Sequence, residues 1–204
     1  MTALATRPRE HVEPIPVEQR FSLGAVEWET YQAIAQALTG RHVRLTYDRG
    51  RLEFMTISGK HGNLSRLFGQ LIVAMADELG IPRRSFGDMT CDSESAMRGL
   101  EPDECFYFDH EPLVRGKDDI DLSVDPPPDL TIEIELTKSR RSRMGIYAAL
   151  RVPEVWRFDG QQLTVNQLGT DGNYVVCDRS RYFPNDSRRR VAPLHRAANS
   201  DGRN

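Results

Sequence analysis

Two glutamates two residues apart, Glu133 and Glu135, are the residues whose type and spacing most directly suggest chemistry. They lie in Leu130–Leu136, where apolar and polar residues alternate as in a strand with one buried face. Both side chains then project from the same face, with Cβ atoms about 7 Å apart. Like charges at that distance need a cation, a water-filled site or a raised pKa. The alternative is that the pair only covers a solvent-exposed sheet face.

Further charged residues lie close to this segment. Asp129 precedes it and Lys138 follows it. Carboxylates beside a cation suit metal-assisted cleavage of a phosphodiester, because hard oxygen ligands hold Mg²⁺ and a Lys or Arg neutralises charge on the phosphate. Pro102-Asp103, about thirty residues before the glutamates, starts an apolar run. As a dipeptide it indicates only a turn, but together with the glutamates it supplies a second acidic position.

The elements that must position these acids are predicted from hydrophobic periodicity and turn residues. Ser22 is expected to cap a helix over Ala25–Leu38, which Gly40 ends. The strongest predicted helix follows Gly62, with apolar residues at three- and four-residue steps up to Leu79. The other predicted elements are a helix over Arg140–Leu150, a hairpin of His42–Tyr47 and Arg51–Met55, and strands over Arg84–Cys91, Glu104–Phe108, Leu130–Leu136, Glu154–Phe158 and Gln162–Asn166.

The order of these elements predicts an α/β (α+β) fold with one mixed central β-sheet flanked by helices. The 204 residues, 39% of them hydrophobic, suffice for one packed core. We expect three parts: a flexible N-terminal arm at 1–19, a folded domain at 20–177, and an Arg-rich disordered tail at 178–204.

Composition excludes several classes of protein. A net charge of −3 excludes a strongly basic coat for nucleic acid but permits a local basic patch. No apolar run approaches the roughly 20 residues of a membrane span, and no secretory signal is recognisable. The cysteines, Cys91, Cys105 and Cys177, are odd in number and form no CxxC pair, so we expect free thiols in the cytoplasm, not a disulfide framework or thiolate zinc site.

Several segments together resemble a known family. Pro102-Asp103 followed by Glu133-Ile134-Glu135 is similar to the PD-(D/E)XK nuclease superfamily. The closer resemblance, over about residues 21–166, is to the Uma-type family of restriction endonucleases. It rests on Leu52-Glu53-Phe54-Met55, Ser58-Gly59-x-His61-Gly62, Pro128-Asp129-Leu130-x-x-Glu133 and the segment Ile146–Trp156, the last being the most specific.

The resemblance implies a restriction-endonuclease-like core and a Mg²⁺ (or Mn²⁺) ion held by Asp103 and Glu133. The superfamily's lysine is expected at position 135, which here is Glu135. In related sequences a cation four residues before the tyrosine matching Tyr147 can replace it, and that position here is Arg143. Arginine can contact phosphate but cannot easily serve as a base, because its pKa lies above about 12. Lys138 is the other candidate, although its direction beyond the strand end is open.

Two further residues match the family pattern. Glu53 is either an additional ligand or water-orienting group, or a solvent-facing hairpin residue. His61 lies where the backbone beside Gly62 could approach a phosphate, or it is a hydrogen-bond partner at a helix start. The run Arg188–Arg190 could contact DNA, or could simply be solvated.

The leading hypothesis is a metal-dependent DNA endonuclease. Asp103 and Glu133, with Glu135 as a further candidate, would bind the ion that activates water, and Arg143 or Lys138 would stabilise charge on the phosphate. Because such sites usually act on pairs of strands, a homodimer is a possible assembly. The alternative is a catalytically impaired nuclease-fold protein that binds nucleic acid or another partner, favoured by the missing lysine at position 135. A weaker alternative is a metal-free structural domain whose acids are surface residues.

Overall fold

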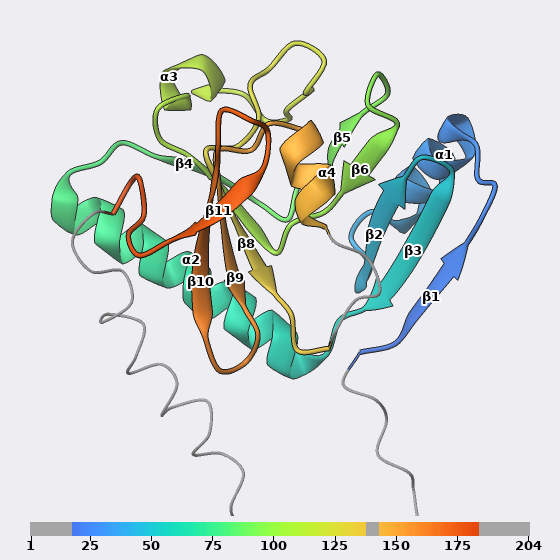
Figure 1. The fold of residues 1–204 in the computed structure, drawn as a ribbon, viewed down its shortest axis with the longest axis horizontal. Coiled ribbons are helices and arrows are strands. Elements are labelled where there is room, and N and C mark those ends of the chain that lie inside the picture. The colour runs from blue at the N-terminus through green and yellow to red at the C-terminus, as the bar shows by residue number, and fades with distance from the viewer. Residues whose placement is uncertain (1–17, 138–142, 184–204) are drawn as a thin grey trace, which may run out of the picture.

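The computed structural model describes residues 18–137 and 143–183, and two β-sheets form its framework (Figure 1). The first sheet has five strands in the order β1-β3-β2-β6-β5, and all its pairings are antiparallel. The second has six strands in the order β11-β10-β9-β8-β7-β4, with a parallel pairing between β8 and β9. The predicted mixed α+β class is therefore confirmed, with the strands divided between two sheets.

The first sheet is built on the predicted hairpin. Its strands are β1 (Arg20–Leu23), β2 (Val43–Asp48), β3 (Arg51–Thr56), β5 (Cys91–Ser93) and β6 (Arg98–Leu100). The turn between β2 and β3 places Arg49 and Gly50 at φ of 48° and 82°, a conformation that favours glycine. Helix α1 (Trp28–Leu38) packs on one face through Trp28 and Tyr31. Ser22 is not its cap: it pairs with Glu53 in β1, because the chain first adds an edge strand to the hairpin.

The second sheet contains the strand that carries the acid pair. Its strands are β4 (Arg84–Gly87), β7 (Glu104–Tyr107), β8 (Leu130–Ile134), β9 (Glu154–Phe158), β10 (Leu163–Leu168) and β11 (Tyr174–Cys177). Of these, β11 is absent from the sequence prediction. Two short helices, α3 (Glu111–Val114) and α4 (Met144–Ala149), follow β7 and β8.

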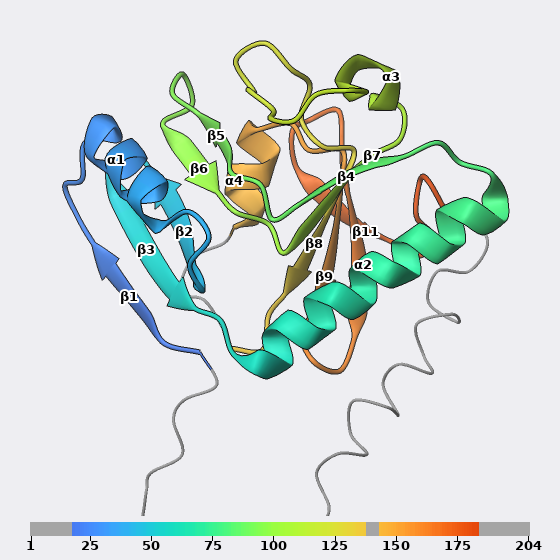
Figure 2. The same cartoon turned by 180° about the vertical axis from the view of Figure 1, so that it is seen from behind.

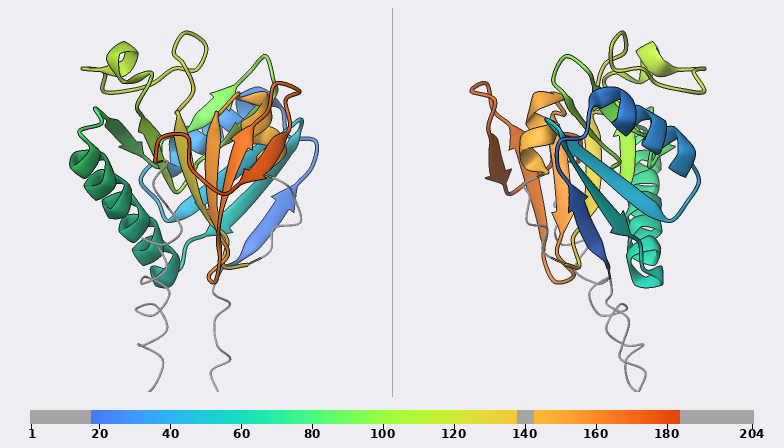
Figure 3. Two further views of the ribbon diagram at one scale, coloured as in Figure 1. Left: turned by 60° about the vertical axis from the view of Figure 1, so that its left-hand side comes forward. Right: turned by 90° about the vertical axis from the view of Figure 1, so that its right-hand side faces the viewer.

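Helix α2 (Gly59–Leu79) covers one face of the second sheet (Figures 2 and 3). The Ser58 hydroxyl caps its first turn, and Gly80, at φ 65°, ends it. The predicted apolar face is confirmed, because Leu64, Phe68 and other residues at helical spacing are buried against β8 and β9. This cluster is the main hydrophobic core.

Strand β8 is covered on both faces. Leu130, Ile132 and Ile134 face α2 in the main core. On the other face, Thr131 and Glu133 lie on the side where α4 packs between the two sheets (Figure 1). Because the first sheet and α4 close over this face, Glu133 is 1% exposed. The solvent-exposed reading of Glu133 is therefore wrong.

The folded part extends slightly beyond the predicted range of 20–177. Glu18 is buried, and Tyr182 and Phe183 pack in the main core. Lys138, the first residues of the helix predicted over Arg140–Leu150, and Arg188–Arg190 lie outside the described residues. Within the ranges 18–137 and 143–183, no helix is long and apolar enough to cross a membrane.

Candidate active site

Asp103, the residue before β7, is held against β8 by the backbone and by α2. Its N–H donates to the Ile132 carbonyl at 3.0 Å, and its Oδ2 accepts from the Ile134 N–H at 2.7 Å. Its Oδ1 lies 2.6 Å from His61 Nε2, and the side chain is almost fully buried. Asp103 is therefore fixed beside Glu133 by contacts with residues on either side of that glutamate.

His61 links Asp103 to a second carboxylate, that of Glu18. His61 Nδ1 lies 2.6 Å from Glu18 Oε1, and Glu18 also accepts a hydrogen bond from Thr137 and pairs with Arg20 at 3.4 Å. Burial by itself would lower the pKa of His61, but hydrogen bonds to Asp103 and Glu18 outweigh it and raise the pKa to about 9. His61 is thus an imidazolium between two carboxylates at neutral pH. Neither of the roles predicted for it included Glu18.

Glu133 contacts Tyr147 of α4 and Arg143, the residue just before that helix. Its Oε1 accepts a hydrogen bond from the Tyr147 hydroxyl and lies 3.1 Å from Arg143 Nη2. Burial raises the pKa of Glu133, and Asp103 adds to this, whereas Arg143 and Tyr147 oppose it. Arg143 also donates to the Glu101 carbonyl. Arg143 therefore points toward Glu133, in the direction that the resemblance implied.

Glu135, at the position expected for lysine, pairs with an arginine that sequence reasoning missed. Arg157 Nη2 lies 2.5 Å from Glu135 Oε2, and Nε lies 3.3 Å from Oε1. In the parallel register of β8 and β9, Arg157 is directly opposite Glu133. Nothing local to Arg157 in the sequence indicates this, because the register depends on how two distant strands pair.

The facing side of the first sheet contributes more charged residues. Glu53 is 5% exposed and pairs with Arg20 at 2.9 Å, so the solvent-facing reading is wrong. Arg44, on β2, pairs with Asp88 at 2.5 Å, and its Nε lies 4.0 Å from Asp103 Oδ1. Arg44 is a second cation that the sequence analysis did not select.

Asp129 makes its hydrogen bonds with the chain segment after β7, not with Asp103 or Glu133. Its Oδ2 accepts from the backbone N–H groups of Phe108 and His110 at 2.7 and 3.0 Å, and His110 Nδ1 lies 2.6 Å from Oδ1. Asp129 therefore anchors the chain after β7 and is structural.

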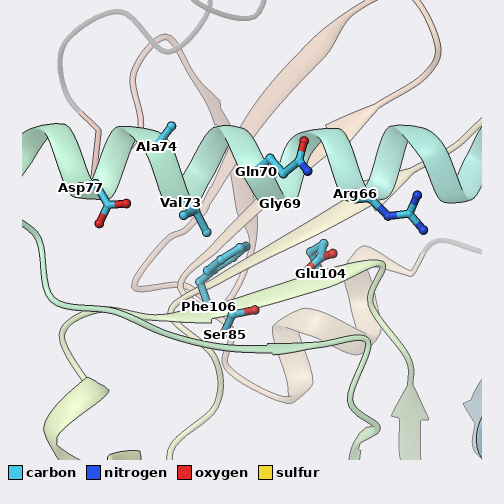
Figure 4. Close-up of a pocket in the computed structure, with 9 residues that line it drawn as sticks. All are labelled: Arg66, Gly69, Gln70, Val73, Ala74, Asp77, Ser85, Glu104 and Phe106. Carbon is cyan, nitrogen blue, oxygen red and sulfur yellow. The ribbon is translucent and has the colours of Figure 1, made fainter.

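Glu104 also points away from the acids of this site. It is opposite Ile132 in register and so lies on the face covered by α2. There it enters a groove of about 390 Å³ between α2, β4 and β7 (Figure 4). A Cβ on Gly69 would lie 3.0 Å from its Oε1, so a larger residue at this point of the helix would require the Glu104 carboxylate to move.

Asp103 and Glu133 offer two carboxylates, the hard oxygen ligands that Mg²⁺ prefers. In the part of the chain that the structure describes, no three His, Cys, Asp or Glu side chains are arranged to hold a metal ion. Mg²⁺, however, is commonly bound through one or two carboxylates together with waters and substrate phosphates. The two adjacent carboxylates fit an ion of that kind and do not fit one held by protein side chains alone.

A protein-family model described as "Uma2: Putative restriction endonuclease" matches residues 28–193. The chain belongs to the Uma2 family. The match confirms the resemblance to a PD-(D/E)XK-type family, and the two-sheet α+β structure is consistent with a restriction-endonuclease-like fold. The matched range includes Asp103, Glu133 and Arg157, whereas Glu18 precedes this range. No curated protein matches the chain.

Proposed function

We propose that this Uma2-family protein is a metal-dependent DNA endonuclease. The observation that carries the proposal is the burial of Asp103 and Glu133 side by side between the two sheets, each held by protein donors. Burying two adjacent carboxylates costs free energy, because each charge loses its hydration. Such a pair therefore indicates a functional site. The family description supports an endonuclease as the class of enzyme.

In this proposal Asp103 and Glu133 hold Mg²⁺ or Mn²⁺ together with the substrate phosphate. The ion would act as a Lewis acid and supply activated water. Asp103 is oriented for this by the Ile134 N–H and by His61. Glu133 is oriented by Tyr147 and Arg143, and the positive charge of Arg143 opposes the rise in the pKa of Glu133 that burial causes.

The second candidate function is a nuclease-fold protein that binds nucleic acid with little or no turnover. Two observations favour it: position 135 is a glutamate, and Glu133 Oε1 is already engaged by Arg143 and Tyr147. Both functions predict DNA binding, so turnover is the measurement that separates them.

The test is plasmid cleavage in Mg²⁺, in Mn²⁺ and in chelator. We expect cleavage with either metal, none in chelator, and loss of cleavage in Glu133→Gln. Glu111→Gln is a suitable control, because Glu111 pairs with Arg115 away from the acid strand. Equal cleavage by wild type and Glu133→Gln would contradict the proposal, and metal-independent DNA binding without cleavage would favour the second function.

We also propose a cellular location and an oligomeric state for this activity. We place it in the cytoplasm, because Cys91 and Cys105 are buried free thiols of the kind found in reducing compartments. We also propose a homodimer on DNA, with one candidate site for each strand.

A further inference from the structure

Arg157 lies on the same face of the second sheet as the proposed metal ligand Glu133. The two residues are directly opposite in the parallel pairing of β8 and β9, so their side chains leave the sheet in the same direction. Val155, two residues earlier on β9, packs in the cluster with α4 on this face. The Arg157 guanidinium is therefore at the edge of the acidic site, beyond the packed part of the interface.

Arg157 is the most accessible of the four described arginines that pair with acids around this site. Its side chain is 36% exposed, compared with 14% for Arg20, 12% for Arg44 and 5% for Arg143. The phosphate arrives with the DNA from solvent, so the simplest condition for a contacting cation is a guanidinium that is exposed before any rearrangement of the site. Arg143 cannot meet this condition without leaving Glu133 and the Glu101 carbonyl.

The hydrogen bonds of Arg157 leave part of its guanidinium available. Nε and Nη2 face the two oxygens of Glu135, at 3.3 and 2.5 Å. A guanidinium has five N–H donors, and this fork-to-fork contact uses two of them. Nη1 makes no hydrogen bond with any residue in 18–137 or 143–183, so two of its N–H groups can bind a phosphate oxygen while Glu135 keeps the side chain in place.

We propose that Arg157 is the residue that contacts the substrate phosphate and that Glu135 is its positioning residue. This inference rests on the proposed endonuclease function and names the cation for it. A glutamate at the position expected for lysine then has a role, because it holds an arginine from the neighbouring strand next to Glu133. Arg143 is assigned a different role, as the internal counter-ion of Glu133.

Binding of a fluorescein-labelled DNA duplex, by anisotropy in chelator over a range of salt, is the first test. Arg157→Ala should weaken binding and lower the slope of log affinity against log salt by about one, because one phosphate contact is lost. Arg157→Lys should recover the slope. The matched control is Arg83→Ala, which breaks a surface pair with Asp77 at the other end of α2 and should leave both quantities unchanged.

Single-turnover cleavage with Mg²⁺ is the second test. Arg157→Ala should lower the rate by about 10²–10³, as expected when a group that stabilises developing charge is removed. Glu135→Lys should also impair cleavage, because it removes the carboxylate that pairs with Arg157 and places a second positive charge beside the guanidinium. Combining it with Arg157→Glu should restore part of the rate, since the exchanged pair returns a cation to the same place.

Wild-type affinity and cleavage in Arg157→Ala would overturn the inference. If Arg157→Ala does not fold, Arg157→Gln replaces it, since it keeps the apolar stem and can still hydrogen-bond to Glu135. The proposed function fails separately, when wild type and Glu133→Gln cleave equally. In that event the salt slope of DNA binding still decides whether Arg157 contacts a phosphate.

Discussion

At the scale of single residues, the charges of this site are arranged in pairs. Arg143 faces Glu133, and His61 lies between Asp103 and Glu18. Buried ion pairs of this kind contribute little net stability, but removing one partner is costly, because the other charge is left in a low-dielectric environment. Each acid is therefore held in one orientation by charged groups of the protein itself.

The pairing of Arg143 with Glu133 has a measurable consequence for stability. Arg143→Ala should lower the free energy of unfolding by about 3–5 kcal/mol, because it leaves the buried Glu133 carboxylate without its cation. Urea unfolding measures this quantity. In the double variant with Glu133→Gln the loss should be clearly smaller than the sum of the single losses, whereas simple additivity would show that the two side chains are not coupled.

Metal binding gives a second prediction for the same residues. Mg²⁺ or Mn²⁺ should raise the melting temperature by mass action, with a gain of about 2.7 kcal/mol at a hundred times the Kd. Glu133→Gln should abolish the rise. A wild-type melting curve that does not change at millimolar metal would count against a site formed by Asp103 and Glu133 in the free protein.

At the scale of elements, the last described residues complete the second sheet's core. The carboxylate of Glu154, on β9, accepts hydrogen bonds from Trp156 Nε1, from Ser180 Oγ and from the Arg181 N–H. These contacts bring Phe183 against Trp156 and Phe108, at the end of the α2 face. The segment after β11 thus supports β9, the strand that carries Arg157.

Phe183→Ala tests this support. Phe183 is 2% exposed, so truncating it should destabilise the protein by roughly 3–5 kcal/mol through lost burial and a cavity. Thermal or urea unfolding is the measurement. Val176→Ala, on β11 and 66% exposed, is the control and should change stability little. Similar small effects from both changes would mean that residues 178–183 do not contribute to the core.

At the scale of the whole molecule, the candidate site is made by the meeting of two sheets. The second sheet and the start of β7 contribute Glu133 and Asp103, the first sheet contributes Arg44 and Glu53, and α4 packs between the sheets. Figure 1 shows this junction, with α4 between the two sheets. Because each sheet supplies part of the charged surroundings, relative movement of the sheets would alter the site.

The proposed homodimer predicts a particular pattern of plasmid products. Two sites acting together on one duplex should convert supercoiled plasmid directly to linear DNA. Sedimentation with a DNA duplex should give two copies of the 23.2 kDa chain per site. Complete accumulation of nicked circles before any linear product, with one copy bound per duplex, would contradict the dimer.

Local pattern in the sequence was enough to predict the β2–β3 hairpin, helix α2, strand β8 and the mixed α+β class, because alternation, helical periodicity and turn residues act over a few neighbours. It also indicated Asp103 and Glu133 as candidate acids, whereas Arg143, as a cation directed toward them, came from the family resemblance. Only the tertiary structure decided the partners: Glu18 on His61, Arg157 on Glu135, and the burial of Glu53. The physical reason is that strand register and the closing of one sheet on another depend on contacts between residues far apart in the chain, and these leave no periodic signal at either residue.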